Sequence, residues 1–419
     1  MRILQLTNKI PYPPSDGGTI AMWQAAAGFA ELGNELSILC MQTAKHRATT
    51  IDSSQFPENL TLEMVDVPAR ITPWGMLGNL LFSSLPYTAS RFIHPAFEKK
   101  LIQLLSEKEY DLVQLEGLYL LPYTSVIRKH SKALIALRAH NIEHEIWERL
   151  AEQSTLLKGW YLSNLSNRIL EFKLQYLDSF DLLIPITQRD ADYYQRLGSK
   201  QAIFVAPVGI SEQLNASGSA PQSKPAETKP TPAQQSSKLP DLFHLGAMDW
   251  PPNIEGLEWF LKEIWPMARH QHPGLKLHLA GRNAPASIVK RWSNLPGVIF
   301  HGEVPSSKAF IVSYPIMIVP LLSGSGMRVK MMEGMMHERA IISTPVGMEG
   351  IAVTPDKNCI IASDKTAWIN AINQLIMNPL KIEHLGKAAS RLVQEKYAAR
   401  SIVEKWCAFY ENALTKAPQ

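Results

Sequence analysis

Residues 320–351, PLLSGSGMRVKMMEGMMHERAIISTPVGMEGI, contain the pattern that decides the fold of this chain. Small residues at 323–326 lead directly into a helical pattern that ends at 337–339, and residues 340–344 have the composition of a short buried strand. A Pro-Val-Gly turn at 345–347 returns the chain toward the same edge. Open parallel sheets bind ligands at such edges. The stretch therefore predicts an α/β fold with a binding site at the ends of its strands.

The loop and the helix start that follows it predict a seat for a diphosphate. Glycines let the backbone approach a ligand closely, and the unpaired amides at a helix start attract an anion. Arg328 and Lys330 add full charges, and Glu333, about one turn further on, can accept hydrogen bonds from two ribose hydroxyls. The alternative is a set of solvated charges on an exposed helix face. The predicted ligand-binding residues are Gly324, Ser325, Gly326, Met327, Arg328, Lys330 and Glu333.

Size and composition indicate a globular enzyme. The 419 residues favour two domains of about 200 residues each, and 46% hydrophobic with 19% charged residues is typical of a soluble protein. A net charge of +4 does not indicate a nucleic acid partner, but it suits an anionic substrate or an acidic membrane surface. Cys40, Cys359 and Cys407 are too few and too far apart to indicate a disulfide framework or a zinc site. Without a signal peptide or an apolar run of about 20 residues, a cytoplasmic location is expected.

Strand and helix patterns alternate along both halves of the chain. This alternation predicts crossover connections and mainly parallel sheets with covered faces, and therefore two similar doubly wound domains. Helices are expected at 19–32, 254–267 and 398–414. Strands are expected at 3–6, 35–41, 112–115, 133–137, 182–186 and 203–206, and again at 242–245, 276–279, 298–300, 317–319 and 340–344.

A segment of low complexity separates the two halves. Residues 213–238 are rich in Ser, Ala, Pro, Gln and Lys and contain no aromatic residue, so they cannot bury enough surface to become ordered. The predicted organisation is an N-terminal domain at 1–209, a flexible insertion at 210–240, a second domain at 241–397, and a C-terminal helix at 398–419 as a candidate for packing back on the first domain.

Short motifs occur in order at 13–18, 138–141, 206–209, 246–253 and 324–350. Together they resemble family four of the sugar-nucleotide-dependent retaining glycosyltransferases. The resemblance implies an α/β fold of GT-B architecture, in which two doubly wound Rossmann-like domains face a central cleft. It also implies transfer of a sugar from a nucleotide-diphosphate donor to an acceptor, with retention at the anomeric carbon and without a bound cofactor or metal.

The resemblance implies roles for particular residues. Arg328 and Lys330 are expected to be catalytic, because they would stabilise the charge on the departing nucleotide diphosphate. His140, at the end of an apolar strand, is expected to contact the donor sugar and to be catalytic, although a lone histidine is more often structural.

Two positions depart from the family pattern. Ser325 stands where the motif has its first glutamate, which is associated with the donor sugar. Ala247 and Asn253 stand where many relatives have an arginine and a lysine near the phosphates. Arg328, Lys330 and Arg282 are therefore expected to carry the phosphate charge, with a surface role as the alternative for Arg282.

The first domain contributes further candidates. Gly17 and Gly18, in a Pro-Ser-Asp-Gly-Gly loop, are expected to bind the donor through backbone amides, with a plain tight turn as the alternative. Residues 71–92 are apolar and aromatic, which is usual for a buried core; at this place they predict a groove for a lipid-linked or hydrophobic acceptor. No metal site is predicted, since 143–145 would cap a helix. The candidate acceptor residues are Trp74, Glu116 and Asn141.

The leading prediction is a retaining glycosyltransferase of polysaccharide or lipopolysaccharide assembly. Its expected partners are a nucleotide-sugar donor, a glycan or lipid-linked acceptor, and the inner face of a membrane as a peripheral contact. Two alternatives stay open. A nucleotide-sugar epimerase on the same fold would convert the donor without an acceptor, and a nucleotide-sugar-binding scaffold would bind the donor without turnover.

Overall fold

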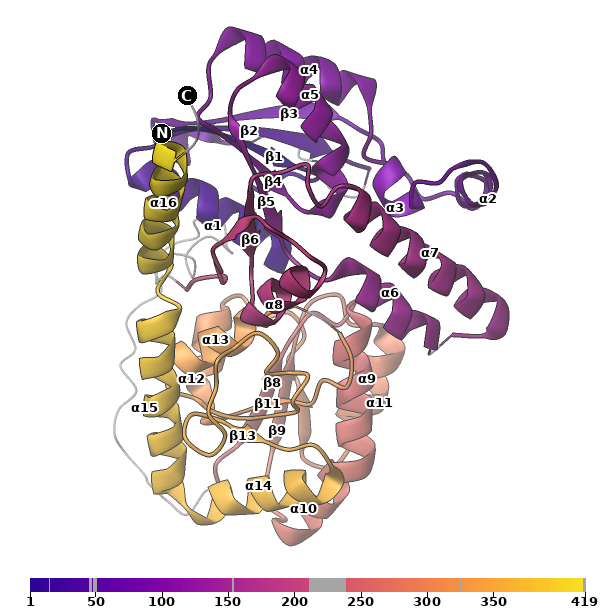
Figure 1. Cartoon of the computed structure of the whole chain (residues 1–419). Helices are drawn as coiled ribbons and strands as arrows, with labels where there is room; N and C mark the ends of the chain where they lie inside the picture. Colours follow the sequence, from indigo (N-terminus) through magenta and orange to yellow (C-terminus); the bar gives the residue numbers. More distant parts are fainter. Residues whose placement is uncertain are drawn as a thin grey trace. The chain divides into compact units, whose positions relative to one another are not determined.

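The computed structural model describes residues 1–14, 16–44, 47, 51–152, 154–210, 239–324 and 326–416. The chain forms two compact units: unit 1 combines Met1–Gly209 with Ala399–Gln419, and unit 2 is Ile210–Ala398. Each unit builds a parallel sheet with helices on its faces, which confirms the predicted pair of doubly wound α/β domains (Figure 1). The predicted insertion at 210–240 lies outside the described residues except at its two ends.

The sheet of unit 1 has the strand order β3-β2-β1-β4-β5-β6-β7, and its described pairs are parallel. The order reverses between β1 and β4, so the ends of these strands form the topological switch point at which such sheets bind ligands. The strands are β1 (Arg2–Thr7), β2 (Glu35–Gln42), β3 (Leu60–Asp66), β4 (Leu112–Glu116), β5 (Leu134–Ala139), β6 (Leu182–Pro185) and β7 (Ala202–Ile203).

The helices of unit 1 fill the connections between these strands. β1 and β4 are almost entirely buried, because crossover helices cover both faces of a parallel sheet. The α-helices are α1 (Gly17–Glu31), α2 (Pro73–Phe82), α3 (Tyr87–Ser90), α4 (Pro95–Glu107), α5 (Thr124–His130), α6 (Glu143–Glu152), α7 (Leu156–Gln175), α8 (Gln188–Arg196) and α16 (Ala399–Lys416), with 3₁₀ turns η1 (Ser53–Gln55) and η2 (Leu118–Tyr123).

The last helix of the chain, α16, completes the core of unit 1. It packs on α1, where the rings of Trp406 and Tyr410 lie 5.0 and 5.8 Å from the ring of Phe29. A Cβ atom on Gly28 of α1 would lie only 2.8 Å from Val403, so the two helices approach closely there. Trp406 and Tyr410 are buried, and the core on this face of the sheet therefore combines the two ends of the sequence.

The sheet of unit 2 has the order β10-β9-β8-β11-β12-β13, with its switch point between β8 and β11. Its strands are β8 (Leu242–Leu245), β9 (Leu277–Ala280), β10 (Val298–Phe300), β11 (Ile316–Val319), β12 (Ala340–Ser343) and β13 (Ile360–Ile361). Its helices are α9 (Pro251–Trp259), the π-helix η4 (Phe260–Ile264), α10 (Trp265–Gln271), α11 (Ala286–Ser293), α12 (Ser307–Ser313), α13 (Val329–Met336), α14 (Lys365–Met377) and α15 (Pro379–Lys396).

Three elements differ from the sequence prediction. The pattern at 254–267 predicts one helix, but the structure has α9, η4 and α10 in succession. Pro266 has no amide to donate to the preceding turn, and the amide of Trp265 bonds to Phe260, five residues back, so the helix widens at this point. The strands β3 and β13 are not predicted. β3 pairs with β2 at the edge of its sheet and is only partly buried, and β13 has two residues.

Candidate active site

The predicted site residues lie in two groups, one at the carboxyl edge of each sheet. In unit 2 they lie after β9, in the loop between β11 and α13, and on α13 itself, beside the switch point. In unit 1 they follow β1, β4 and β5.

The loop before α13 has the backbone that the sequence predicts. Gly324 and Gly326 have φ values of 106° and 83°, in the left-handed region that favours glycine. A Cβ on Gly324 would lie 3.1 Å from the ring of Trp250 and 3.0 Å from the guanidinium of Arg328. Glycine is therefore required for close packing as well as for conformation. Ser325, predicted to bind the donor, lies outside the described residues, and Met327 is half-buried in the same loop.

Arg328 is the residue from which α13 begins, and its side chain is held in place. Its Nη1 donates a hydrogen bond to the carbonyl of Gly326 at 2.6 Å, and its guanidinium lies 5.2 Å from the centre of the Trp250 ring. A cation over an aromatic face is attracted by the ring quadrupole. Trp250, which precedes α9, thus fixes both the glycine loop and the arginine.

Lys330, Glu333 and Arg282 lie close enough to influence one another. Lys330 is exposed at its surface, but the protein around it removes part of the water from its ammonium group and so lowers the pKa of that group. The charge of Glu333 opposes this shift, and the charge of Arg282 adds to it. Burial raises the pKa of Glu333, an effect that Lys330 opposes. Within the described part of the chain, Glu333 Oε2 is a buried atom without a hydrogen-bond partner. The cluster has a net positive charge and an acceptor ready for a ligand hydroxyl.

A buried histidine lies near Lys330. The ring of His244, in β8, bonds through Nδ1 to the carbonyl of Ile318 at 2.9 Å. Burial lowers its pKa to about 4, so the imidazole is neutral at physiological pH. A Cβ on Gly246 would lie 2.8 Å from His244 and 2.7 Å from Asn253. Asn253 is buried and donates to the carbonyl of Ala247 at 2.8 Å, so it stabilises the backbone of this loop.

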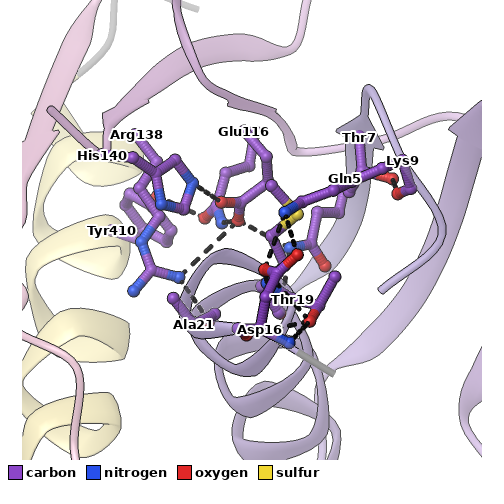
Figure 2. Close-up of polar contacts among 12 residues, drawn as sticks. Gln5, Thr7, Lys9, Asp16, Thr19, Ala21, Glu116, Arg138, His140 and Tyr410 are labelled. Carbon is purple, nitrogen blue, oxygen red and sulfur yellow. Dashed lines mark hydrogen bonds and ion pairs between the residues drawn. The ribbon is translucent and has the colours of Figure 1, made fainter. Parts of the chain in front are cut away.

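In unit 1, the half-buried His140 is one end of a buried polar network (Figure 2). Its Nε2 lies 2.6 Å from Oε2 of Glu116, the last residue of β4. Glu116 is buried, and Gln5 and Gln114 donate hydrogen bonds to its other oxygen at 2.6 and 2.5 Å. The hydroxyl of Tyr410, on α16, donates to Gln114 at 2.8 Å. The network therefore connects His140 to the C-terminal helix through the centre of the sheet.

The charge on Glu116 determines the tautomer of His140. Burial raises the pKa of Glu116, but Arg138 and the bond to His140 outweigh this effect and bring the pKa down to about 2. An ionised carboxylate accepts hydrogen bonds only, so Nε2 of His140 carries the proton. In the neutral ring, Nδ1 is then an acceptor. The geometry makes Glu116 a positioning residue for His140, and this role does not fit the predicted contact between Glu116 and an acceptor.

Arg138 compensates the buried carboxylate. Its Nη1 lies 3.7 Å from Oε1 of Glu116 and donates to the carbonyl of Ala21 in α1 at 2.8 Å. Its guanidinium also lies 4.6 Å from the ring centre of Trp406. The sequence analysis gave no role to Arg138, because nothing in the local pattern shows that it pairs with a residue of another strand.

The start of α1 carries an ion pair that sequence reasoning missed. Asp16 caps the helix by accepting a bond from the amide of Thr19, and Nζ of Lys9 lies 2.8 and 2.9 Å from its two carboxylate oxygens. α1 begins at Gly17, two residues before the predicted start. A Cβ on Gly18 would lie 2.9 Å from Nζ of Lys9, whereas one on Gly17 would meet nothing within 4 Å. Close packing against Lys9 therefore explains the glycine at position 18, whereas the space beside Gly17 is open.

The remaining candidates lie apart from these contacts. Trp74 is on α2 and is 82% exposed, so the helical part of residues 71–92, the stretch predicted to form an acceptor groove, is not part of a buried core. Asn141 is half-buried in the turn before α6. Glu143 is 3.4 Å from Lys173, and Glu145 is 3.2 Å from Arg149, so both carboxylates are in ion pairs. No group of His, Cys, Asp or Glu among the described residues is arranged to hold a metal ion.

Comparison with known proteins finds a matching family model in unit 2 and a relative that matches nearly the whole chain. Residues 239–378 match the family model described as "Glycosyl transferases group 1". Over almost the full length, with 96% of this chain and 97% of the relative covered, the chain is 22% identical to an "Uncharacterized 44.6 kDa protein in cps region" of Klebsiella pneumoniae.

Solved structures show the same fold over both units. The sucrose-phosphate synthase of Thermosynechococcus elongatus has a TM-score of 0.69 at 16% identity, with both chains covered completely. Anabaena HepE in complex with UDP has a TM-score of 0.63 at 14% identity, over 98% of this chain and all of the other. The pneumococcal O-GlcNAc transferase GtfA, in complex with UDP and GlcNAc, has a TM-score of 0.62 at 12% identity, over 100% of this chain and 99% of the other.

Proposed function

We propose that this glycosyltransferase, whose residues 239–378 form a group 1 glycosyl transferase domain, transfers a sugar from a nucleotide-diphosphate donor to a glycan or lipid-linked acceptor. The family match and the shared fold confirm the predicted relationship to the GT-B glycosyltransferases. The observation that carries the proposal is the charge cluster of Arg282, Lys330 and Glu333 in unit 2, together with Arg328 at the start of the helix that carries Lys330 and Glu333.

The cluster suits a departing nucleotide diphosphate. As the bond to the sugar breaks, negative charge grows on the diphosphate, and donors already fixed in place stabilise that charge without reorganising. Arg328 is fixed by Trp250 and Gly326, and the amides at the start of α13 add a partial positive charge. Arg328 and Lys330 therefore bind the diphosphate, and Gly324, Gly326 and Met327 let it approach the backbone. Arg282 supplies the third positive charge.

Other residues bind the nucleoside and the sugar of the donor. The unpartnered Oε2 of Glu333 accepts a hydrogen bond from a ribose hydroxyl. Uridine is the proposed base, because HepE and GtfA bind UDP. In unit 1, Nδ1 of His140 accepts a hydrogen bond from the sugar while Glu116 holds the ring, and Gly17 and Gly18 let the backbone approach the donor. Retention follows if the acceptor attacks on the face from which the diphosphate departs, with a phosphate oxygen taking the acceptor proton.

The acceptor and the pathway rest on a more distant likeness. The relative from Klebsiella pneumoniae is described by its place in the cps region, which supports a role for this chain in assembling a cell-surface polysaccharide. A growing glycan or a lipid-linked glycan is the acceptor class that such assembly requires.

Calorimetric titration tests the proposal. Uridine, guanosine, thymidine and adenosine diphosphates are titrated into the full chain, and UDP is expected to bind most tightly. Arg328→Gln with Lys330→Gln is expected to weaken UDP binding at least about 100-fold, because each substitution removes a charge-assisted hydrogen bond worth about 1.5–3 kcal/mol. Lys262→Gln with Arg400→Gln, two side chains that are each 82% exposed, is the matched control. Equal affinity of the double variant and the control would refute the site.

Turnover distinguishes the remaining functions. With UDP-sugars and a polysaccharide or lipid-linked acceptor, NMR of the product is expected to show an unchanged anomeric configuration. An altered sugar on the nucleotide, formed without acceptor, would indicate an epimerase instead. Tight donor binding with neither a transfer product nor slow hydrolysis of the donor would indicate a scaffold.

A further inference from the structure

Two helices of unit 1 expose large apolar side chains. None of the residues of α2 is buried, and Trp74 and Phe82 are 82% and 89% exposed. The first turns of α7 expose Leu157 and Trp160 to 87% and 61%. Single exposed apolar residues are ordinary, but a group of this size marks an interaction surface. We call this group the apolar surface; it comprises Ile71, Trp74, Leu77, Leu81, Phe82, Leu156, Leu157 and Trp160.

The two helices lie beside each other. Arg168 of α7 donates hydrogen bonds to the carbonyl and side chain of Asn79 and to the carbonyl of Ser83, at the end of α2. Seven residues earlier on α7, Tyr161 interacts electrostatically with Tyr87, whose hydroxyl accepts a bond from the amide of Thr72 at the start of α2. The bonds of Arg168 hold the end of α2 against the middle of α7. Leu157 and Trp160 lie about three and two turns before Arg168 on α7 and form the second part of the apolar surface.

The charges of these segments have one sign. Residues 67–97 and 154–170 contain no Asp or Glu, and their basic residues are Arg70, Arg91, Lys158 and Arg168. Arg91 and Arg168 bond to backbone carbonyls, at Ala69 and at the end of α2. Arg70, in the segment before α2, and Lys158, on α7, are exposed and lie close in sequence to the apolar surface. The acidic residues of α6 and α7 lie outside these segments, at Glu143, Glu145, Glu148 and Glu152 on α6 and at Glu171 near the end of α7.

We propose that the apolar surface of α2 and the start of α7 docks unit 1 onto an anionic lipid bilayer. Tryptophan is the side chain best suited to the boundary between lipid headgroups and acyl chains, and one lies on each helix. Exposed cations beside an apolar helix face add attraction to acidic lipids. A protein partner or a second copy of this chain would need acidic side chains placed opposite Arg70 and Lys158. A bilayer needs only an apolar interior and acidic headgroups. In the described part of the chain no helix is long and apolar enough to cross a membrane, so the contact is peripheral.

Vesicle sedimentation of the full chain tests this proposal. Binding is expected to phosphatidylglycerol–phosphatidylcholine vesicles and to be much weaker with phosphatidylcholine alone. Leu157→Ser with Trp160→Ser, and separately Phe82→Ser, is expected to lower the partition coefficient at least about tenfold, because lipid burial of each side chain is lost. Lys158→Glu is expected to lower it more than about fivefold, and only on anionic vesicles.

Control variants distinguish binding through this surface from nonspecific hydrophobic binding and from misfolding. Met377→Ser with Leu380→Ser removes two side chains of unit 2 that are 77% and 66% exposed, and is expected to bind vesicles like the unaltered chain. The altered α7 residues are exposed, so thermal unfolding and UDP affinity are expected to stay unchanged. Vesicle binding that is equal in all variants overturns the proposal. So does a concentration-dependent dimer, measured by light scattering, that the Leu157 and Trp160 substitutions abolish while vesicle binding persists.

Discussion

Glu116 illustrates how a single buried charge organises unit 1. Four partners contact its carboxylate: Arg138, His140, Gln5 and Gln114. Because the pKa of Glu116 is about 2 in the folded chain against an ordinary value of 4.5, its contribution to stability is complete above pH 4.5 and is lost as the pH falls toward 2. Removing the charge would leave Arg138 buried without a counterion.

Glu116→Gln is expected to lower the free energy of unfolding by about 3–5 kcal/mol, the usual cost of breaking a buried ion pair on one side. Urea unfolding followed by tryptophan fluorescence measures the change. Glu109→Gln is the matched control, because Glu109 is 91% exposed beside Arg2 and its substitution should change stability by less than about 0.5 kcal/mol. Similar losses in both variants would contradict the role given to Glu116.

If Glu333 binds the ribose as proposed, donor binding depends on pH. Burial raises the pKa of its carboxyl above the ordinary value of 4.5, and only the ionised form is an acceptor for two hydroxyls. UDP affinity is therefore expected to fall as the pH drops toward and below the raised pKa. Glu333→Gln should weaken UDP binding about tenfold at neutral pH and remove most of this acid-side fall, as measured by calorimetry across pH. A pH profile identical in the variant would place the ribose elsewhere.

The sequence predicts some site residues and misses others for a physical reason. Gly324, Arg328 and Glu333 are adjacent in one loop and helix, so their spacing alone indicates a ligand site. Trp250 and Arg138 act on partners that lie far away in the sequence, and only the packing of separate elements brings them together. A local pattern contains no information about that choice of partner.

At the scale of elements, the close approach of α9 to the end of β11 positions the glycine loop. A Cβ on Gly256 of α9 would lie 2.2 Å from the carbonyl oxygen of Pro320, which directly precedes that loop. The space is closed by backbone, so neither side can yield without moving an element.

Gly256→Ala is expected to lower the free energy of unfolding of unit 2 by about 1–3 kcal/mol, even though alanine favours helix. Differential scanning calorimetry measures the loss. Gly78→Ala, in α2, places its Cβ where nothing lies within 4 Å and should leave stability unchanged or slightly raised. Equal thermal midpoints for the two variants would show that α9 has room to shift.

Most elements are predictable from sequence because buried parallel strands and amphipathic helices have distinct patterns. β8 and β10 have the predicted bounds, and most other strands differ by one or two residues. The failures are instructive. β3 alternates polar and apolar residues at a sheet edge, β13 is too short to show a period, and the π-helix depends on how Trp265 and Pro266 pack.

For the whole molecule, buried histidines predict sensitivity to acid in both units. Burial lowers the pKa of His144 in unit 1 and of His244 in unit 2 from 6.5 to about 4, and Lys173 adds to the effect on His144. The unfolded chain binds these protons more readily, so stability is greatest above pH 6.5 and falls as the pH decreases toward 4.

His244→Asn is expected to flatten this fall for unit 2, which for a fully buried histidine is on the order of 3 kcal/mol. Urea unfolding at several pH values between 6.5 and 4 measures the slope. His270→Asn, at the end of α10, serves as a control and should keep the slope of the unaltered chain. A slope that persists in His244→Asn would assign the acid sensitivity to other groups.

The path of the chain through unit 1 has a consequence for its synthesis. The strands of this unit leave the ribosome before unit 2, but Trp406 and Tyr410, which cover Phe29, are translated after it. Tyr410 also bonds to Gln114, in the centre of the sheet. At roughly 5–20 residues per second, the nascent sheet waits through the translation of all of unit 2 with one apolar face covered by α1 but not yet by α16. Chaperone dependence during translation, and its loss when α16 is moved to the N-terminus by circular permutation, follow from this order.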